Sequence, residues 1–353
     1  MVEKKFRCPD CRKVTSHSGM PGKLKTIYCP FCGSKGMARF PKPLPKKDIA
    51  IEVSDLRKVY GDLVAVNNIS FSVNKGEVFA FLGPNGAGKT TTVEMIESIR
   101  QPTAGVIKIL GADIKTQFKK VKENIGILPQ EFHSFDLLTV RETLDYFAKI
   151  YKKHANIDTI IDAMDLRSYE KQLYKNLSGG LKQRVGVAIS LVNDPDIVFL
   201  DEPTTGLDPK ARREVWMVIA DLKKRGKTVF LTTHYMEEAE FLADRICILH
   251  KGKIIAEGSL EHLIQHYGNK SILNIKNCKT SNAVELLREQ GYHANPKGNG
   301  NIAIRIEYKE RVLDILSYLR YECMDYESID IRRSNLEEVF LSLTGAKLSE
   351  EET

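Results

Sequence analysis

A glycine-rich stretch directly after an apolar run constrains the fold of this 353-residue chain more than any other feature. The apolar run is Val78 to Leu82, and the residues after it fit the pattern G-x4-G-K-[ST] just before a helical segment. This order is typical of a phosphate-binding loop, because glycines let backbone N–H groups close around phosphate oxygens and the helix N-terminus adds positive charge. Lys89 supplies a full charge, and the hydroxyl of Thr90 is a ligand for Mg²⁺. The predicted phosphate contacts are Gly83, Pro84, Asn85, Gly86, Ala87, Gly88, Lys89, Thr90 and Thr91.

A second apolar run ends in two carboxylates. Ile197 to Leu200 reads as a strand, and Asp201 and Glu202 follow it. We expect this strand to lie beside the strand of the phosphate-binding loop, which would bring Asp201 to the Mg²⁺ ion and Glu202 nearer the γ-phosphate, where it polarises a water molecule. The alternative is a strand that ends in a solvated acidic turn, and the phosphate-binding loop upstream favours the first interpretation.

Strand-like and helical stretches alternate through the middle of the chain. Beyond the two runs above, Val229 to Thr232 and Ile246 to Leu249 are apolar and are separated by amphipathic segments. The alternation indicates an α/β domain with a mostly parallel sheet covered by helices. We place this domain at residues 48–268, after an N-terminal module of residues 1–47 and before a C-terminal domain of residues 269–353.

The C-terminal domain has its own order of elements. A strand from Ser271 to Ile275 precedes a helix, two strands joined by a turn at Pro296 to Gly300, and a further helix and strand. The order β-α-β-β-α-β predicts a ferredoxin-like α+β unit. A last helix, Leu336 to Leu343, is apolar on one face, and we expect it to dock on the body of the chain or on a second subunit.

Five further motifs accompany the phosphate-binding loop. They are Tyr60 upstream, Gln130 in ILPQE, the run Asn176 to Arg184 (NLSGGLKQR), Asp208 in TTGLDP, and His234 in TTHY. In this order they resemble the adenine-stacking aromatic residue, the Q-loop, the signature motif, the D-loop and the switch histidine of the ATP-binding subunits of ATP-binding cassette (ABC) transporters. The resemblance covers residues 49–258 and implies a P-loop ATPase cassette with a helical signature subdomain.

The resemblance also implies a dimer and a set of roles. Each ATP would lie between the phosphate-binding loop of one subunit and the signature motif of the other, so we expect a head-to-tail homodimer. Ser178, Gly179 and Gly180 then form a second anion-binding helix N-terminus, before a helix predicted at Lys182 to Asn193. By resemblance, Tyr60 stacks on adenine, Glu202, His234 and Gln130 act at the γ-phosphate and the attacking water, Asp208 lies at the nucleotide, and Thr90, Gln130 and Asp201 bind Mg²⁺.

Two features of the sequence indicate which subgroup of ABC transporters the chain resembles. The fifth residue of the signature motif is Leu181 where Gln is common in the family, and export-type members often have an apolar residue there. Ser334 to Gly345 resembles the end of ABC-2 type export ATPases, which pair with separate membrane permeases. The resemblance thus implies an efflux ATPase that acts on its permease through Gln130 and Glu131 to Leu138. The alternative is a soluble ABC ATPase that acts on ribosomes or nucleic acid, and the single uninterrupted cassette favours transport.

The N-terminal module carries two C-x2-C pairs. Seventeen residues separate Cys8 and Cys11 from Cys29 and Cys32, a spacing typical of a four-cysteine zinc site. The spacing predicts a zinc ribbon, with rubredoxin-type iron as a second option and redox-active or unrelated thiols as the remaining alternatives. A Pro/Lys tract from Phe40 to Lys47 reads as an extended linker.

Charge is distributed unevenly along the chain. The formal net charge is +7, but residues 1–47 hold twelve basic and two acidic side chains, so the module carries +10 and the remainder −3. This distribution argues against nucleic-acid binding by the whole chain. Docking to the permease or another protein is the favoured use of the module, ahead of contact with anionic lipid or with nucleic acid.

Apolar segments long enough for a membrane are missing from the sequence. No apolar run approaches the ~20 residues that cross a bilayer, and the N-terminus lacks the apolar region of a secretory signal. We therefore expect a peripheral protein on the cytoplasmic face of the cell membrane.

Overall fold

The computed structural model describes residues 48–268, 271–306, 311–332 and 335–345, together with four strands and residues Pro30 and Cys32 of the N-terminal module. The chain divides into two compact units, Met1–Asp48 and Ile49–Thr353.

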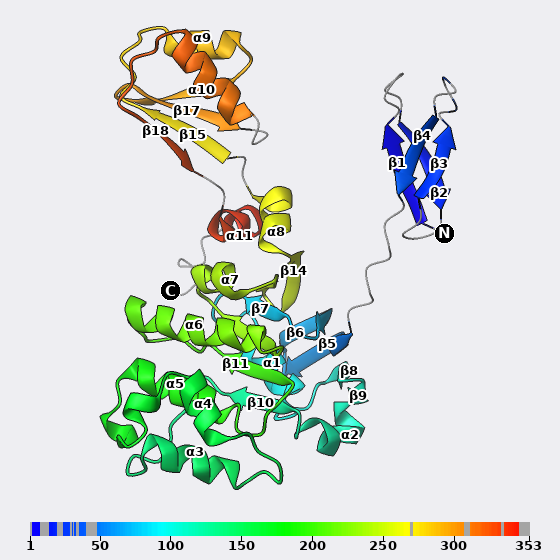
Figure 1. Ribbon diagram of the computed structural model, residues 1–353, viewed down its shortest axis with the longest axis vertical. Helices are drawn as coiled ribbons and strands as arrows, with labels where there is room; N and C mark the ends of the chain where they lie inside the picture. Colours follow the sequence, from blue (N-terminus) through cyan, green and yellow to red (C-terminus); the bar gives the residue numbers. More distant parts are fainter. Residues whose placement is uncertain are drawn as a thin grey trace. The chain divides into compact units, whose positions relative to one another are not determined.

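The described part of the first unit consists of two antiparallel strand pairs (Figure 1). β1 (Val2–Arg7) pairs with β2 (Val14–Gly19), and β3 (Leu24–Tyr28) pairs with β4 (Lys35–Arg39). In the sequence, one C-x2-C pair falls between the two strands of each pair. Cys8, Cys11 and Cys29 lie outside the described residues, as does the predicted linker Phe40 to Lys47, whereas Cys32 is described and exposed.

A mostly parallel sheet forms the centre of the second unit (Figure 1). Its strands are β7 (Val78–Leu82), β10 (Ile125–Leu128), β11 (Ile197–Asp201), β12 (Thr228–Thr233), β13 (Arg245–His250) and β14 (Lys253–Gly258). The order across the sheet is β10-β11-β12-β7-β13-β14, and β14 runs antiparallel to β13. All residues of β7, β11 and β12 are buried, as expected for parallel strands covered on both faces.

This strand order corrects one prediction. β11 is not the neighbour of β7, because β12 lies between them and pairs in parallel with both. Strand order depends on long-range pairing, which a local run of apolar residues does not encode. Asp201 aligns with Thr232, and Thr233 aligns with Leu82, so the carboxyl ends of the three strands meet at one edge of the sheet. The carboxylates after β11 therefore reach the phosphate-binding loop across the end of β12.

A second, antiparallel sheet shares a core with the first. It consists of β5 (Ile49–Tyr60), β6 (Leu63–Asn74), β8 (Ala104–Ile109) and β9 (Ala112–Asp113) in the order β6-β5-β8-β9, and α2 (Ile114–Val121) follows it. The ring of Phe71 in β6 lies 5.3 Å from that of Phe81 in β7 and 6.1 Å from that of Phe230 in β12, measured between ring centroids. Helix α1 (Lys89–Ile96) adds Val93, Met95 and Ile96 to the same core. This core fixes the strand and the helix on either side of the phosphate-binding loop.

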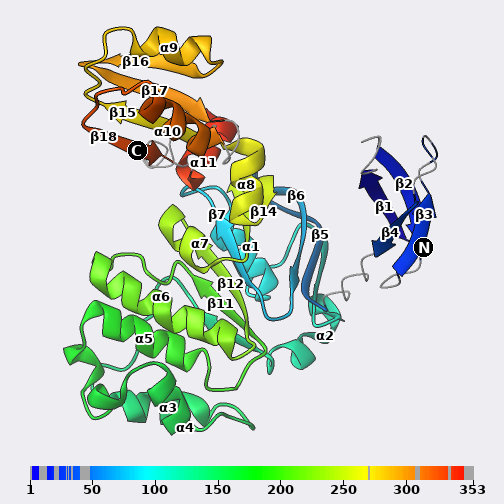
Figure 2. The same ribbon diagram turned by 45° about the horizontal axis from the view of Figure 1, so that its top comes forward.

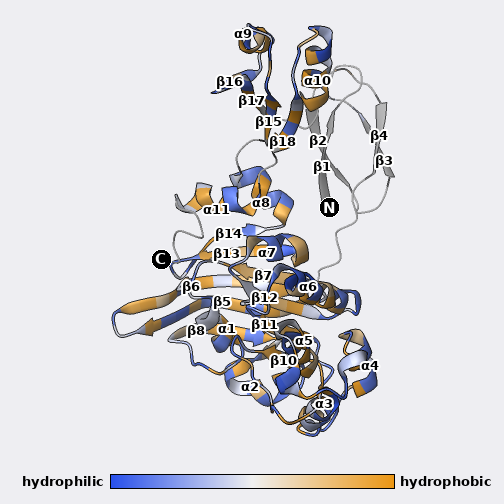
Figure 3. Ribbon diagram, turned by 90° about the vertical axis from the view of Figure 1, so that its left-hand side faces the viewer, coloured by the Kyte–Doolittle hydropathy of each residue, from blue (hydrophilic) through white to orange (hydrophobic). Residues whose placement is uncertain are grey.

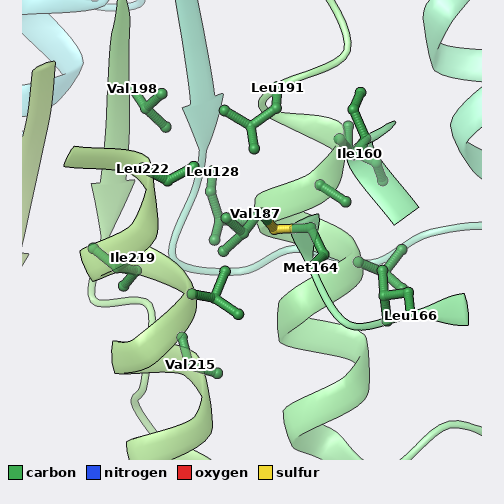
Figure 4. Close-up of a cluster of buried hydrophobic side chains, with 14 of the residues drawn as sticks. Leu128, Ile160, Met164, Leu166, Val187, Leu191, Val198, Val215, Ile219 and Leu222 are labelled. Atoms are coloured by element: carbon green, nitrogen blue, oxygen red, sulfur yellow. The ribbon is translucent and has the colours of Figure 1, made fainter. Parts of the chain in front are cut away.

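A layer of helices covers the other face of the parallel sheet. The helices are α3 (Val140–Ala148), α4 (Ile157–Ala163), α5 (Gly179–Ile189) and α6 (Pro209–Lys224), with short 3-10 turns at Arg167–Tyr169 and Tyr174–Asn176. Figure 4 shows the side chains of Leu128 from β10, Met164 from the segment after α4, and Ile219 from α6 gathered in one cluster. In Figure 3, hydrophobic and hydrophilic residues alternate along helices such as α6, which is typical of helices that bury one face.

A further group of elements forms a four-stranded antiparallel sheet with two helices. They are β15 (Ser271–Lys276), α9 (Ala283–Glu289), β16 (His293–Gly298), β17 (Asn301–Ile306), α10 (Arg311–Tyr321) and β18 (Ser328–Arg332). The sheet order is β16-β17-β15-β18. The predicted turn at Pro296 to Gly300 is too long, because β16 stays paired as far as Gly298 and the chain reverses at Asn299 and Gly300, both with positive φ.

The last helix docks on the body of the same chain. α11 (Leu336–Thr344) packs on α8 (Leu260–Tyr267) and α7 (Met236–Leu242), and Figure 2 shows α11 beside α8. Phe340 is fully buried in a cluster that includes Ala80 and Leu82 of β7. The backbone N–H of Leu336 also donates a hydrogen bond to Glu240 Oε1 at 2.7 Å. Of the two predicted alternatives, docking within the chain is the one observed.

Candidate nucleotide-binding site

The loop between β7 and α1 needs glycine at two positions for steric reasons. A Cβ on Gly83 would lie 2.3 Å from the carbonyl oxygen of Leu249, and one on Gly88 would lie 2.5 Å from that of Ala65. Gly88 also has φ of +101° as the N-cap of α1, a conformation that other residues rarely adopt. The glycines of the predicted phosphate-binding loop thus allow a tight turn packed against neighbouring backbone. Asn85 and Gly86 are exposed at its tip, and Thr90 and Thr91 are half-buried in the first turn of α1.

Lys89 is buried beneath this loop. Its Nζ donates hydrogen bonds to the carbonyl oxygens of Gly83 at 2.8 Å and Pro84 at 3.1 Å. It also lies 3.2 Å from Glu202 Oε1, and both side chains are 4% exposed. The amine is therefore fixed between the phosphate-binding loop and the carboxylate that follows β11.

Asp201 and Glu202 leave β11 in different directions. Oδ1 of Asp201 accepts a hydrogen bond from the hydroxyl of Thr232, and burial raises the pKa of Asp201. Glu202 has a positive φ of 48°, and its backbone N–H bonds to Thr232 on the neighbouring strand. A non-glycine residue in this conformation costs about 1 kcal/mol. The turn at Glu202 directs its side chain toward Lys89.

Glu202 is the centre of the site. Oε2 lies 3.2 Å from Nδ1 of His234 and accepts hydrogen bonds of 3.2 Å from Nε2 of Gln130 and from the hydroxyl of Thr205. Burial opposes the charge of Glu202, but the hydrogen bond with His234 and the positive charge of Lys89 outweigh it and lower the pKa of Glu202 to about 2. Glu202 is therefore ionised at neutral pH. An ionised carboxylate can accept a hydrogen bond from a water molecule and so orient and polarise it.

Four predicted residues thus come together from separate segments. Lys89 begins α1, Gln130 follows β10, Glu202 follows β11, and His234 follows β12. The side chain of His234 is 13% exposed, whereas Gln130 is exposed at the surface. A hydroxyl from Thr90, an amide oxygen from Gln130 and a carboxylate from Asp201 are the hard oxygen donors that Mg²⁺ prefers, so these residues fit the ion chemically.

Tyr60 lies at the end of β5 with part of its ring open to solvent. The residue is 38% exposed. Two cations approach it, with Lys58 Nζ 5.0 Å and the Arg100 guanidinium carbon 5.5 Å from the ring centroid. Arg100 is itself paired with Glu94. Both cations therefore lie within the range of a cation–π interaction with the ring.

The signature residues form an exposed helix N-terminus. Ser178 is the N-cap of α5, and its Oγ accepts a hydrogen bond of 3.3 Å from the N–H of Leu181. α5 begins at Gly179 and ends at Ile189, so the predicted helix was placed too late at both ends. Ser178 and Gly179 are exposed, while Gly180 lies close to Ala211 of α6. Leu181 is buried in the core of the helical layer, which explains an apolar residue at this position.

Asp208 has a structural contact of its own. It is the exposed N-cap of α6, and its Oδ1 accepts hydrogen bonds from the N–H groups of Lys210 at 2.9 Å and Ala211 at 3.1 Å. An N-cap of this kind stabilises a helix by about 1 kcal/mol. The structure therefore gives Asp208 a capping role, whatever its part at the nucleotide.

Comparison with known proteins identifies the family. Residues 66–205 match the family model described as ABC transporter. A Nod factor export ATP-binding protein I of Burkholderia lata is 36% identical over 313 residues, which cover 85% of this chain and 98% of that protein. The chain belongs to the ABC transporter family of ATP-binding subunits. A Nod factor export ATP-binding protein I of Rhizobium johnstonii is 37% identical over 306 residues, covering 85% of this chain and 96% of that protein.

Solved ABC structures show the same cassette. The protein cbiO1 of Clostridium perfringens, part of the ABC transporter complex cbiONQ, matches with a TM-score of 0.56 and 28% identity over 60% of this chain and 89% of that one. A dimeric bacterial ABC transporter cassette matches with a TM-score of 0.53 and 27% identity over 59% of this chain and 98% of that one. As a member of this family, the protein is an ATPase whose activity is coupled to transport.

Two searches of the described residues found nothing further. None of their helices is long and apolar enough to cross a membrane. The same part of the chain holds no group of three or more His, Cys, Asp or Glu side chains that could hold a metal ion. Three of the four predicted zinc ligands of this ABC subunit lie outside it.

Sequence reasoning missed two hydroxyl residues of the site. Thr232 bonds to Asp201, and Thr205 bonds to Glu202. Both lie inside the motifs quoted above, in TTHY and TTGLDP. The signal was therefore present, but assigning a partner to Thr232 required knowing that β12 is the neighbour of β11.

Proposed function

We propose that this chain is the ATP-hydrolysing subunit of an exporter whose permease is a separate membrane protein. The observation that carries the proposal is the convergence of Lys89, Gln130 and His234 on the ionised carboxylate of Glu202. The relatives named as export ATP-binding proteins support the direction of transport. The place of action is then the cytoplasmic face of the membrane.

Hydrolysis is proposed to occur between two copies of the chain. The helix N-terminus at Ser178 and Gly179 is exposed, and none of the hydrogen bonds of Lys89 or Glu202 described above involves it. A head-to-tail homodimer brings this N-terminus to the phosphates held by the other copy. Tyr60 stacks on adenine, and Asp208 lies at the same interface.

Within each site, this chain's residues orient the reactants. The carboxylate of Glu202 accepts a hydrogen bond from the attacking water and so orients it. His234, whose ring is bonded to Glu202, contacts the γ-phosphate. Mg²⁺, when bound by Thr90, Gln130 and Asp201, neutralises charge on the phosphates.

An exposed hydrophobic patch is the proposed contact with the permease. Phe135 and Tyr146 are each 48% exposed, Leu137 is 72% exposed and Ile150 is 64% exposed. The rings of Phe135 and Tyr146 lie edge to face with centroids 4.9 Å apart. Phe135 and Leu137 belong to the segment that begins after Gln130. An exposed aromatic cluster of this kind is typical of a protein interface.

Detergent extraction tests the exporter assignment. The tagged full chain is expected to recover a polytopic membrane protein, and the paired substitution Phe135→Ser with Leu137→Ser is expected to abolish recovery while leaving ATP binding intact. Leu63→Ser, at another exposed site (66% exposed), is the matched control. Recovery of ribosomes or RNA instead would contradict the proposal and favour the soluble ABC ATPase.

We also propose that strands β15 to β18, with α9 and α10, form a ferredoxin-like domain, because their order along the chain is β-α-β-β-α-β.

We further propose that the N-terminal module is a metal-stabilised docking module. The strand pairs β1-β2 and β3-β4, each with one C-x2-C pair between its strands in the sequence, support a ribbon built around one ion, zinc ahead of iron. The charge of +10 also suits anionic lipid headgroups. Elemental analysis of the full chain is expected to find one zinc ion per chain, which Cys8→Ser with Cys11→Ser removes. Retention of the metal by that variant would exclude the predicted ligand set.

A further inference from the structure

Glu238 is a buried carboxylate one turn beyond His234, in α7. Its side chain is fully buried, and Oε1 accepts hydrogen bonds from the Thr204 hydroxyl at 2.7 Å and from the indole N–H of Trp216 at 2.8 Å. Thr204 lies in the loop just after Glu202, and Trp216 lies in α6. Oε2 of the same carboxyl is buried and has no hydrogen-bond partner among the described residues, so Thr204 and Trp216 hold the group through Oε1 alone. Glu238 therefore ties together three segments: the loop of residues 203–208, α6 and the start of α7.

A second set of contacts joins the same three segments. The guanidinium carbon of Arg212, in α6, lies 3.9 Å from the centroid of the Tyr235 ring. Nη2 of Arg212 donates a hydrogen bond of 3.5 Å to the carbonyl oxygen of Leu207. The Tyr235 ring is in turn 4.0 Å from the His234 ring, between centroids. The segment that carries His234 and Tyr235 is thus held to α6 by Arg212, while Glu238, just after it in α7, is bonded to Thr204.

Besides the Tyr235 ring, the ring of His234 contacts the carboxylate of Glu202. Among the described residues, Glu202 is the one hydrogen-bond partner of its ring, through Nδ1 at 3.2 Å. Glu202 and His234 follow neighbouring strands, β11 and β12. Their distance therefore depends on how the chain continues after each strand. The bond from Thr204 to Glu238 joins these two continuations directly.

We propose that Glu238 is a positioning residue of the ATPase reaction, which holds α7 against the loop of residues 203–208 and so keeps His234 beside Glu202. This inference rests on the proposed function of Glu202 and His234. Glu238 is not a catalytic residue, because its contacts are with Thr204 and Trp216 and not with Lys89, Glu202 or the phosphate-binding loop.

Truncation and conservative replacement of Glu238 test this role. Glu238→Ala removes the acceptor of Thr204 and Trp216, whereas Glu238→Gln keeps an oxygen acceptor at the same length. We expect Glu238→Ala to lower kcat by about 10- to 100-fold, the cost of a misplaced catalytic group. ATP affinity is expected to stay within about twofold. Glu238→Gln is expected to keep most of the wild-type kcat. Glu237 is an exposed neighbour on the same helix, and Glu237→Ala is expected to change neither kcat nor ATP affinity.

A double-mutant cycle separates positioning from a general structural defect. Single-turnover hydrolysis is measured for Glu238→Ala, His234→Ala and the double variant. If Glu238 acts through His234, Glu238→Ala has no further effect in the His234→Ala background. An equal fold loss in both backgrounds would overturn the inference while leaving the proposed function intact. An unchanged rate in His234→Ala alone would remove the proposed role of His234 and this inference with it.

A milder pair of variants covers the case in which Glu238→Ala does not fold. Trp216→Phe removes one donor to Oε1 and keeps an aromatic ring, and Thr204→Val removes the other donor at similar size. Each is expected to lower kcat several-fold in the wild-type background and to have no effect in the His234→Ala background. Loss of ATP affinity without loss of kcat would contradict a positioning role.

Discussion

Two buried glutamates of the ATPase unit have pKa values that move in opposite directions. The pKa of Glu202 is lowered to about 2 because His234 and Lys89 outweigh the effect of burial. The pKa of Glu97, at the end of α1, is raised to about 8 by burial and by the nearby charges of Asp201 and Glu94. Glu97 Oε1 has no hydrogen-bond partner among the described residues. The charge of a buried carboxylate therefore depends on the cations and hydrogen-bond donors around it and not on burial alone.

Glu97 gives a prediction of pH dependence at the scale of one residue. Its pKa rises from an ordinary 4.5 in the unfolded chain to about 8 in the folded protein, so between these values the folded protein keeps a proton that the unfolded chain has lost. The free energy of unfolding therefore falls as pH rises through this window. Glu97→Gln is expected to reduce the fall by up to about 5 kcal/mol.

Denaturant unfolding near both ends of this pH window measures the effect. Glu237→Gln is the control, because Glu237 is exposed and is not among the charges that raise the pKa of Glu97. A pH dependence that is the same in the wild type and in Glu97→Gln would show that Glu97 does not hold the extra proton.

At the scale of elements, sequence patterns predict the positions of strands better than they predict which strands are neighbours in the sheet. The predicted strand Val78 to Leu82 is confirmed without change as β7, and the run from Ile197 is confirmed as β11, one residue longer than predicted. The neighbour of β11 was predicted wrongly, and so was the start of α5. Ser178 and the two glycines belong to α5 as cap and first turn, although glycine has low helix propensity, because Ser178 caps the helix and Gly180 packs against Ala211 of α6.

The docking of α11 gives a prediction at this scale. Phe340 is fully buried in the cluster that contains Ala80 and Leu82 of β7, so Phe340→Ala is expected to destabilise the cassette by about 3 kcal/mol. Leu341→Ala, on the exposed side of the same helix, is expected to cost less than about 1 kcal/mol. Thermal unfolding of the full chain measures both. Equal shifts for the two variants would mean that α11 does not depend on the buried contact.

At the scale of the whole molecule, charge and chemistry belong to different units. The first unit carries +10 within residues 1–47, and the remainder of the chain, at −3, contains every residue of the nucleotide-binding site. The sequence allowed the site residues to be named because their motifs are local in the chain. Glu202 contacts Lys89, Gln130 and His234 because of the strand order and of a backbone turn with positive φ at Glu202. A local sequence pattern predicts neither of these features.

The central claim is that Glu202 organises hydrolysis at a site completed by a second copy of the chain. Glu202→Gln tests it directly, with ATP turnover and size-exclusion chromatography in ATP measured on the same preparation. We predict turnover at least about 100-fold lower, unchanged ATP binding, and an ATP-dependent dimer that Ser178→Trp in the same background abolishes. Wild-type turnover in Glu202→Gln, or a variant that stays monomeric with ATP bound, would contradict the account.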